Sequence, residues 1–458
     1  MPAYHLPGLG EDLSTEVQRV RDIEIEVARL SPEELRHSIA VARATATRWL
    51  RQQSVEAILG ALDEVVGRWL SPSFHLRQAV EELVPMATGF SRESVREGFP
   101  LLMLPLREAP LRTLLDAELG DCRVLDQARR GRRVVGPTVV THVLSGNIPG
   151  LAALPIIATL ALKSAVIVKP AAGDPIVPAL LASSIAEVST GLGRCIVVAP
   201  WRGGDTALEE VAFRDVDLVV ASGTDAAITE IAARVPGRFI GHGHKMSVAA
   251  IGRERLADAN ALRGLAQRLA YDVSLWDQEG CLSPQACYVE SGGAASPVRF
   301  AEHLAHALAE QARTLPPRTL TLDDKAAVLR FRQEAEWRAD HGVRLYTSPD
   351  SADWTVTVEP GAELMPTCLH RCVRVKVVGN LDEIPAAIVP HRRQIEAVGL
   401  AVGAERVAAV VEMLSAAGVH RVCPVGTMQQ PPLSWVQSGR PRIGDWVEWM
   451  AVEGGLDA

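Results

Sequence analysis

Short apolar runs separated by helical patterns fill the chain from about residue 165 onward. The runs 165–169, 195–200 and 217–221 are rich in valine and isoleucine and each ends in a loop, which predicts three buried strands. The Ala, Leu and Ile side chains of 177–190 predict a helix between the first two runs. Strands that alternate with helices in this way predict parallel β-α-β units and a doubly wound sheet.

The second half of the chain repeats this pattern. Strands are predicted at 247–251, 286–290, 373–378 and 419–423, and helices over 253–271, 298–314, 322–338 and 402–417. We therefore expect a second doubly wound sheet, followed by a Trp-rich tail at 431–458 that ends in an amphipathic turn at 443–450.

Two stretches precede the alternating region. Residues 1 to about 118 have helical patterns, with Ser31 as an N-cap, Pro32 at the first helical position and Glu34 placed for a capping box. They predict a helical layer on an α/β domain. Residues 124–144 are rich in β-branched side chains around a turn at 129–133, which predicts a β hairpin.

Length and charge narrow the class of protein. The chain has 458 residues, 48% of them apolar, so two or more domains with sizeable cores are expected. A net charge of −8 without a long Lys or Arg run argues against a nucleic-acid partner. The most apolar run, 151–168, contains Pro155 and Lys163, so no membrane span is expected, and no signal peptide is visible.

The cysteines point to a reducing compartment. Their number, seven, is odd and they show no framework spacing, which predicts a reduced, cytoplasmic protein. Cys368-Leu-His370-Arg-Cys372 matches no common zinc pattern, so no metal is expected.

Cys281 is the candidate nucleophile. It lies between Gly280 and a Leu-Ser-Pro that cannot continue a helix, just before the strand predicted at 286–290. Such a loop can expose the sulfur and turn its own backbone N–H toward a bound carbonyl, as a nucleophilic cysteine requires. A nearby helix N-terminus would favour the thiolate. The alternative is an inert buried thiol, because free cysteine is among the most buried residue types.

Asn147 is the candidate oxyanion donor. The sequence Ser145-Gly-Asn147-Ile-Pro-Gly150 follows one strand and opens a helix, so the Asn147 amide can face a negative oxygen at the positive end of that helix. The alternative is a turn asparagine, which is common where Gly and Pro cluster.

Further candidates follow from the sheet itself. Ligands of doubly wound sheets bind beyond the carboxyl ends of the strands. Two cations at such ends, Lys169 and Arg202, could meet an adenosine 2′-phosphate. The same rule selects Gly203 and Gly204, and also Ser222, Gly223 and Thr224. Gly241-His-Gly243 continues as His-Lys-Met, so a dinucleotide fingerprint is excluded there.

Taken together, these stretches resemble the aldehyde dehydrogenase superfamily and, more narrowly, the fatty acyl-CoA reductase family typified by the reductase of bacterial bioluminescence. Four motifs occur in the expected order: Ser-Gly-Asn147-Ile-Pro-Gly, Val-Lys169-Pro, His-Gly-His244-Lys245 and Asp-Gln-Glu-Gly-Cys281-Leu-Ser-Pro. The resemblance covers about residue 120 to the end of the sequence.

The resemblance implies a role for each matching residue. Cys281 would form a thioester, and Asn147 with the Cys281 backbone N–H would form the oxyanion hole. Lys169 would hold the adenosine ribose of a nicotinamide cofactor, and Ser222-Gly223-Thr224 would flank its phosphates. It also implies bridging β structure that pairs subunits into a homodimer or homotetramer.

The chain departs from the oxidising members of the superfamily. Gly241 occupies the place of the Glu that activates water there, and Cys368 aligns with the Glu that holds the nicotinamide ribose. Gln437-Ser438-Gly439 stands where the bioluminescence-type family has His-Asp-Gly. His242 and His244 have suitable unperturbed pKa values, and His244 could protonate the thiohemiacetal oxygen.

The sequence therefore predicts an aldehyde dehydrogenase-like α/β protein with two doubly wound parallel-sheet domains, a helical N-terminal layer and a bridging β hairpin. Residues 1–240 would hold the cofactor, 241–430 would carry Cys281, and 431–458 would pack back on the cofactor domain or a partner subunit. The leading function is NADPH-dependent reduction of an acyl-CoA or acyl-carrier-protein thioester to an aldehyde, with CoA as the leaving group. The alternatives are NAD-dependent aldehyde oxidation to the acid, a cofactor-free cysteine acyltransferase or thioesterase, and a scaffold with an inert Cys281.

Overall fold

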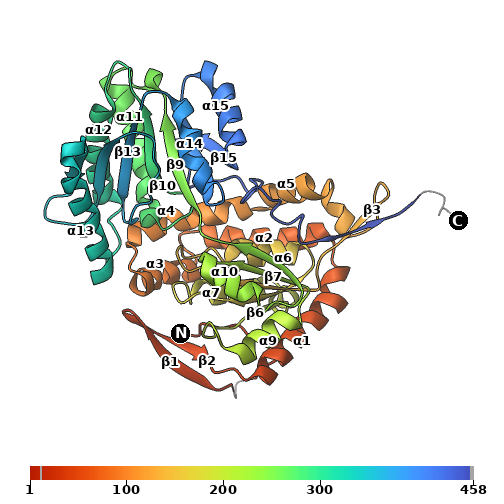
Figure 1. Ribbon diagram of the computed structural model, residues 1–458. Coiled ribbons are helices and arrows are strands. Elements are labelled where there is room, and N and C mark those ends of the chain that lie inside the picture. The colour runs from red at the N-terminus through yellow and green to blue at the C-terminus, as the bar shows by residue number, and fades with distance from the viewer. Residues whose placement is uncertain (11–12, 454–458) are drawn as a thin grey trace.

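Two separate sheets organise most of the chain in the computed structural model, which describes residues 1–10 and 13–453 (Figure 1). The first sheet is parallel throughout, in the order β6-β5-β4-β7-β8. It consists of β4 (Val139–Val143), β5 (Ala165–Lys169), β6 (Ile196–Val198), β7 (Leu218–Ser222) and β8 (Arg238–His242), connected through α6 (Ala153–Ala161), α7 (Val177–Val188), α8 (Thr190–Gly193), α9 (Thr206–Arg214) and α10 (Asp225–Ala232). The strands and the helix predicted between 165 and 221 are confirmed.

The second sheet has the order β11-β12-β13-β10-β9-β14-β15 and is parallel except for its β11–β12 pair. Its strands are β9 (Met246–Ile251), β10 (Pro284–Glu290), β11 (Arg344–Thr347), β12 (Thr355–Pro360), β13 (Cys372–Val378), β14 (Ile395–Ala401) and β15 (Arg421–Pro424). Its helices are α11 (Ala259–Ser274), α12 (Pro297–Thr314), α13 (Leu322–Trp337), α14 (Ile384–Ile388) and α15 (Ala404–Ala416). Helix α11 begins later than predicted because Asp258 is its N-cap.

Helices cover both faces of the second sheet. Consecutive residues of a strand point to opposite faces, and in β9 Val248 and Ala249 accordingly belong to two different apolar clusters. The cluster of Ala249 includes α11 and α12, and the cluster of Val248 includes α14 and α15. This arrangement is the doubly wound architecture that the apolar runs predicted.

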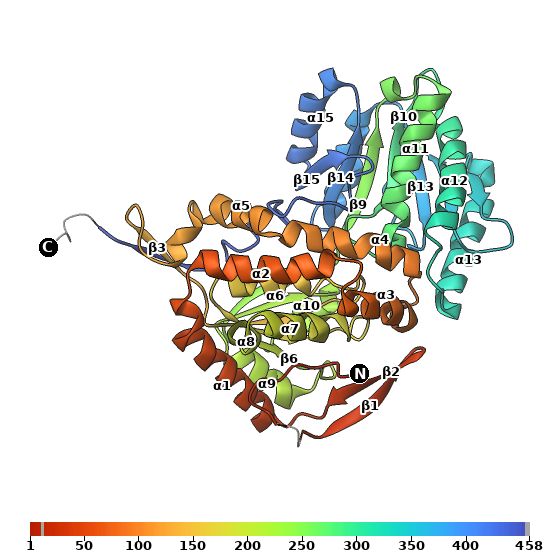
Figure 2. The same ribbon diagram turned by 180° about the vertical axis from the view of Figure 1, so that it is seen from behind.

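The N-terminal helices form the predicted layer, and they are α1 (Pro32–Arg48), α2 (Val55–Leu70), α3 (His75–Thr88), α4 (Arg92–Met103) and α5 (Glu108–Leu119). Helix α1 begins with the complete capping box of Ser31 and Glu34. Helices α4 and α5 lie between the two sheets in both views (Figures 1 and 2). Gly98 of α4 lies so close to Trp276 that a Cβ there would be 2.1 Å from the indole ring.

Two antiparallel strand pairs outside the main sheets differ from the predictions. Residues 1–118 contain an antiparallel pair, β1 (Thr15–Val20) with β2 (Ile23–Ala28), where only helices were expected. The hairpin predicted at 124–144 is wrong. Strand β3 (Arg132–Val135) instead pairs antiparallel with β16 (Glu448–Ala451), and β4 belongs to the first sheet. An alternating pattern identifies a strand but does not identify a partner about three hundred residues away.

The C-terminal segment runs back along the first sheet before it reaches β16. Arg238 of β8 donates to the backbone carbonyls of Asp445 and Trp446, and the Trp446 ring lies 5.2 Å from the His142 ring of β4. The last residues of the amphipathic turn predicted at 443–450 form the beginning of strand β16. Within the described residues, no helix has the length and apolar character needed to cross a membrane.

Candidate active site

The carboxyl ends of the first sheet bring several predicted residues to one edge. Strand β4 lies in the middle, with β5 on one side and β7 on the other, so the loop at Asn147 lies between Lys169 and Ser222. The chain reverses its direction of winding at β4, and this is where doubly wound sheets bind ligands.

Two glycines let the loops after β4 and β5 pack backbone against backbone. A Cβ on Gly146 would lie 2.9 Å from the backbone nitrogen of Gly173, and one on Gly173 would lie 2.3 Å from the Gly146 carbonyl oxygen. Asp174 then accepts hydrogen bonds from the backbone N–H groups of Gly150 and Val177. Its complete burial raises the pKa of this carboxyl to about 7. The Asn147 loop is thus fixed at both ends.

The Cys281 loop is built from an unusual backbone. The short 3-10 helix η5 (Leu275–Gln278) contains Trp276, Asp277 and Gln278, all with positive φ. The Gln278 amide donates to the carbonyls of Pro284 and Cys372, and the Ser247 hydroxyl donates to the Cys281 carbonyl at 2.7 Å. The loop is therefore tied to three strands of the second sheet.

A second left-handed turn, Leu369–His370–Arg371, packs against the first. The fully buried Arg371 guanidinium pairs with Asp277, and the His370 backbone N–H donates to the Asp277 carbonyl at 3.2 Å. Cys368, just before this turn, donates from its thiol to the Cys372 sulfur at 3.5 Å. The two turns hold one another through a single buried ion pair.

The structure brings Asn147 to the Cys281 loop across the boundary between the two sheets. The Asn147 Nδ2 group donates to the Glu279 carbonyl at 2.6 Å, and the Asn147 Oδ1 atom is buried without a partner among the described residues. Because a carbonyl oxygen only accepts, the Glu279 carbonyl fixes the orientation of the Asn147 side-chain amide, with its NH₂ group toward Glu279. One N–H of Asn147 is engaged in this contact, and the other is available to a substrate oxygen.

Cys281 lies half-buried in an apolar cluster with Leu282, Ala397 and Trp435. Burial, together with the nearby Glu396 carboxylate, raises the pKa of the Cys281 thiol to about 12. We expected a nearby helix N-terminus to favour the thiolate, and the raised pKa contradicts this expectation. Two cations, Arg442 and Arg421, act on the same thiol in the opposite direction.

Gly241 is the residue that the sequence aligns with the water-activating Glu of aldehyde oxidisers. A Cβ on Gly241 would lie 2.5 Å from the Ile228 side chain, so a larger residue there would require that side chain to move. Glu279 directs its carboxylate to the Arg318 guanidinium at 2.6 Å, and burial raises the pKa of that carboxyl. Glu279 is thus engaged in an ion pair although it lies two residues from Cys281.

The two candidate histidines differ in their surroundings. His244 is exposed and lies in the linker between the two sheets, where its backbone N–H donates to Asp225 of α10. Among the described residues, no recorded contact joins the His244 ring to Cys281. His242 is half-buried, and burial together with Arg442 lowers the pKa of its ring to about 4. It is His242, rather than His244, that faces the charges around Cys281.

The edge predicted to hold a cofactor has free polar groups. Lys169 is half-buried, and burial lowers the pKa of its amine. Gly203 and Gly204 have open space where a Cβ would stand. Thr224 caps α10, whose first N–H groups lie at this edge. A cation, open glycines and a helix N-terminus fit the ribose and phosphates of a dinucleotide.

Several residues of this region were missed by the sequence. Glu209 faces Lys169, accepts from the Gly204 backbone N–H and pairs with Arg234. Glu396 was detectable as a charged residue inside an apolar strand. Nothing in the local pattern at Arg442 or Trp435 indicated that either lies near Cys281.

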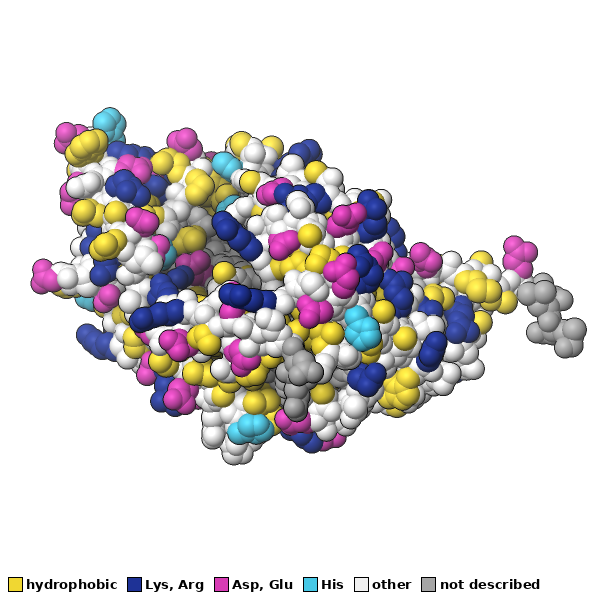
Figure 3. Space-filling view, turned by 90° about the horizontal axis from the view of Figure 1, so that it is seen from below, with side chains coloured by type: hydrophobic (Ala, Val, Ile, Leu, Met, Phe, Trp, Pro, Cys, Tyr) yellow, Lys and Arg dark blue, Asp and Glu magenta, His cyan; other side chains and the backbone are white. Residues whose placement is uncertain are grey.

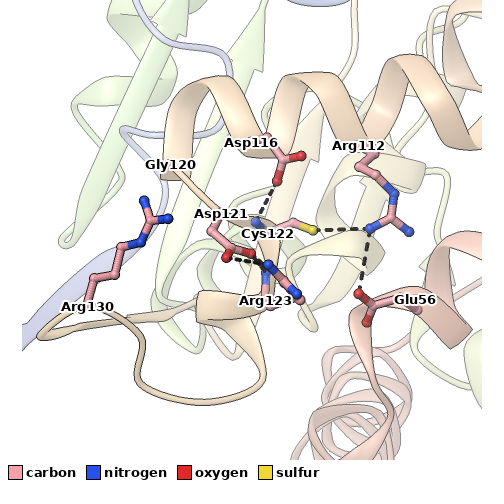
Figure 4. A pocket seen from close by; sticks show the side chains of 8 residues that line it. All are labelled: Glu56, Arg112, Asp116, Gly120, Asp121, Cys122, Arg123 and Arg130. Carbon is pink, nitrogen blue, oxygen red and sulfur yellow. Dashed lines mark hydrogen bonds and ion pairs between the residues drawn. The ribbon is translucent and has the colours of Figure 1, made fainter.

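A separate polar pocket lies on the N-terminal helices (Figure 4). Asp116, Asp121 and Cys122 are close enough there to hold a cation, but Arg123 pairs with Asp121 and Arg112 donates to the Cys122 sulfur. Asp121 and Cys122 thus already contact arginines, Asp116 accepts from the Cys122 backbone N–H, and no site is assigned to the pocket.

On the face shown in Figure 3, acidic and basic side chains are interspersed, and one hollow has Lys and Arg side chains along its rim.

Comparison with known proteins agrees with this geometry. The model of a family described as acyl-CoA reductase (LuxC) matches residues 50–439. The long-chain acyl-protein thioester reductase of Vibrio harveyi is 26% identical over 402 residues, which cover 85% of this chain and 81% of that protein. The reductase of the same name from Aliivibrio fischeri is 27% identical over 351 residues, covering 74% and 71%.

Among solved structures, aldehyde dehydrogenase 21 from Physcomitrella patens superposes with a TM-score of 0.70 at 13% identity, covering 99% of both chains. At this identity the likeness concerns the fold alone. The chain has the aldehyde dehydrogenase fold that the motifs implied.

The buried pair of Asp277 and Arg371 gives a stability prediction. Asp277→Asn leaves a fully buried guanidinium without its carboxylate, which costs roughly 3–5 kcal/mol. We expect a clear drop in the midpoint of thermal unfolding. Glu210→Gln, which breaks the exposed Arg214 pair, is the control and should cost about 1 kcal/mol or less. Equal midpoints for Asp277→Asn and wild type would contradict the prediction.

Asp174 predicts a pH dependence of stability. Its pKa is raised from 3.8 to about 7 in the fold, so the folded state binds more protons than the unfolded state between these values. Stability contributed by this group is present at low pH, falls as pH rises through about 4 to 7, and then levels. The difference in unfolding midpoint between wild type and Asp174→Asn should fall over the same window. A difference that is constant with pH would show that Asp174 ionises normally.

Proposed function

Because the chain belongs to the acyl-CoA reductase (LuxC) family, we propose that it reduces an acyl thioester to an aldehyde through a covalent thioester on Cys281, with NADPH as the hydride donor. One observation carries the proposal. Asn147 from the first sheet meets the Cys281 loop of the second sheet, and Gly241, which aligns with the water-activating Glu of oxidisers, has no side chain that could serve as a base.

The proposed chemistry begins when the Cys281 thiolate attacks the thioester carbonyl. The second N–H of Asn147 and the Cys281 backbone N–H would stabilise the oxyanion, and collapse would release the carrier thiol. NADPH, when bound, supplies the hydride that reduces the acyl carbon. Return of the thiohemiacetal to the carbonyl state would then free the aldehyde and the Cys281 thiolate. His244 is proposed to exchange the proton of the thiohemiacetal, with half-buried His242 as the alternative.

Residues at the edge of the first sheet are proposed to hold the cofactor. Lys169 would bind the adenosine ribose, the Gly203-Gly204 backbone would allow close approach, and Ser222-Gly223-Thr224 would meet the phosphates at the start of α10. Arg202 is exposed and has no recorded ion pair among the described residues. It is therefore available for a 2′-phosphate.

The acyl donor is proposed to be an acyl-CoA or an acyl-carrier protein. The two relatives from luminous bacteria are named for acyl-protein thioesters, and the cluster of Leu282, Ala397 and Trp435 beside Cys281 suits an apolar chain. Exposed Val135, Trp449 and Met450 on β3 and β16 support a homodimer or homotetramer that covers this arm. Seven free cysteines support the reducing environment of the cytoplasm.

Trapped aldehyde provides the direct test. Purified protein incubated with NADPH and a long-chain acyl-CoA should form aldehyde, detected by mass spectrometry as a hydrazone. Cys281→Ala should abolish the product and the acyl adduct, whereas Cys423→Ala, a half-buried cysteine of β15, should retain both. An adduct on Cys287 or Cys368 in the wild type would contradict the assignment.

The same mixture without NADPH separates the remaining functions. We expect little free acid, because Gly241 carries no carboxylate, Glu279 is paired with Arg318, and the Glu396 carboxylate near Cys281 accepts hydrogen bonds from Ser438. Fast acid release would favour a thioesterase, and aldehyde oxidation indifferent to CoA would favour an NAD-dependent oxidiser.

Arg202 predicts the cofactor preference. Arg202→Ala removes a charge-assisted hydrogen bond to the 2′-phosphate, so the KM for NADPH should rise roughly tenfold and that for NADH should not change. Arg214→Ala, an exposed arginine on α9 of the same sheet, is the matched control. Equal efficiency with both cofactors in wild type and Arg202→Ala would refute the assignment.

A further inference from the structure

The C-terminal segment brings a half-buried cation, Arg442, to the environment of Cys281. The Arg442 Nε group donates to the Trp435 carbonyl at 3.1 Å, and its guanidinium lies 5.0 Å from the centre of the Trp435 ring. Trp435 belongs to the apolar cluster that packs with Cys281. Arg442 and Cys281 are thus close to each other although 161 residues separate them (442 − 281).

Two carboxylates fix this segment through its backbone. Glu118 of α5 accepts from the backbone N–H groups of Arg442, Ile443 and Gly444. Glu396 of β14 accepts from the Ser438 backbone N–H at 2.8 Å and from its hydroxyl. The register of β14 shifts between Ile395 and Val398, and such a bulge redirects side chains beside a site. The backbone that carries Arg442 is therefore fixed in position.

Titratable and charged groups of both signs surround Arg442. Those that act on it or on its neighbours are Glu118 of α5, Glu396 of β14, Arg421 of β15, His242 of β8 and the Cys281 thiol. Burial lowers the pKa of Arg442 to about 10. Among the described residues, no carboxylate forms an ion pair with its guanidinium. A half-buried cation without an ion-pair partner gains from a negative charge nearby, and the Cys281 thiol, which becomes an anion during the reaction, is one of the groups that act on Arg442.

We propose that Arg442 is the electrostatic partner of Cys281 and stabilises its thiolate from the C-terminal segment. This rests on the proposed role of Cys281 as the nucleophile. The Cys281 S–H bond breaks, its proton passes to solvent, and the new negative charge is balanced by Arg442. After attack on the acyl carbon, the carrier sulfur leaves with the bonding electrons and takes up a proton, so charge and protons balance.

Glu396 is the opposing member of the same arrangement. It is almost fully buried and acts on Cys281 with the sign opposite to that of Arg442. Glu396→Gln keeps an oxygen that can accept from Ser438 but removes the charge. The two substitutions therefore move the reactivity of Cys281 in opposite directions, which loosening of the C-terminal segment alone would not produce.

The test is the rate at which iodoacetamide alkylates Cys281 in the full-length protein between pH 7 and 9, with the modified peptide identified by mass spectrometry. Alkylation rate follows the thiolate fraction, and a neighbouring charge shifts a pKa by about one unit or more. Arg442→Gln should slow alkylation about tenfold, Arg442→Lys should stay near wild type, and Glu396→Gln should accelerate it about tenfold. Exposed Arg440→Gln on the same segment is the control and should change little.

Equal rates for Arg442→Gln and Arg440→Gln would overturn the proposal, as would slowing by both Arg442→Gln and Glu396→Gln. In urea all variants should react alike. If Arg442→Gln does not fold, Arg442→Lys and Glu396→Gln decide the matter. Because alkylation needs neither thioester nor NADPH, its outcome is independent of the aldehyde assay: failure of the proposed function appears as aldehyde formation by Cys281→Ala.

Discussion

The buried ion pair between Asp277 and Arg371 is the constraint on which the geometry around Cys281 depends. Each partner lies within or beside three consecutive residues of positive φ, a conformation that costs L-residues roughly 1–2 kcal/mol apiece. Such strained turns persist only where surrounding contacts determine them. Here the guanidinium of one turn satisfies the carboxylate of the other, and the same contact fixes the loop that leads to Cys281.

The sequence predicted the parts of the fold that depend on local pattern. Apolar runs located β5, β6 and β7 of the first sheet and β9, β10, β13 and β15 of the second, but not β8, β11, β12 or β14. The rule for carboxyl ends selected Lys169 and Ser222, and the structure places the Asn147 loop between them. The contact between Asn147 and the Cys281 loop was expected from the family resemblance rather than from the pattern. Roles at this edge stay predictions.

Contacts between distant segments could not be predicted in this way. Strand β3 was assigned a neighbouring partner, but its partner is β16, because alternation carries no information about which edge a strand joins. Arg442 and Glu396 are near Cys281 only because the C-terminal segment folds back between the sheets. The raised pKa of Cys281 likewise comes from burial by residues far away in the sequence.

The hydrogen bond from Asn147 to the Glu279 carbonyl has a mechanical consequence. It is short, and it joins the two halves of the molecule at the point where the proposed chemistry takes place. A displacement of one half by about 1 Å is enough to misalign reacting groups. Any opening that admits a carrier or releases a product by separating the halves would have to break this bond. Ligand exchange by such an opening and reaction would then occupy different moments of the cycle.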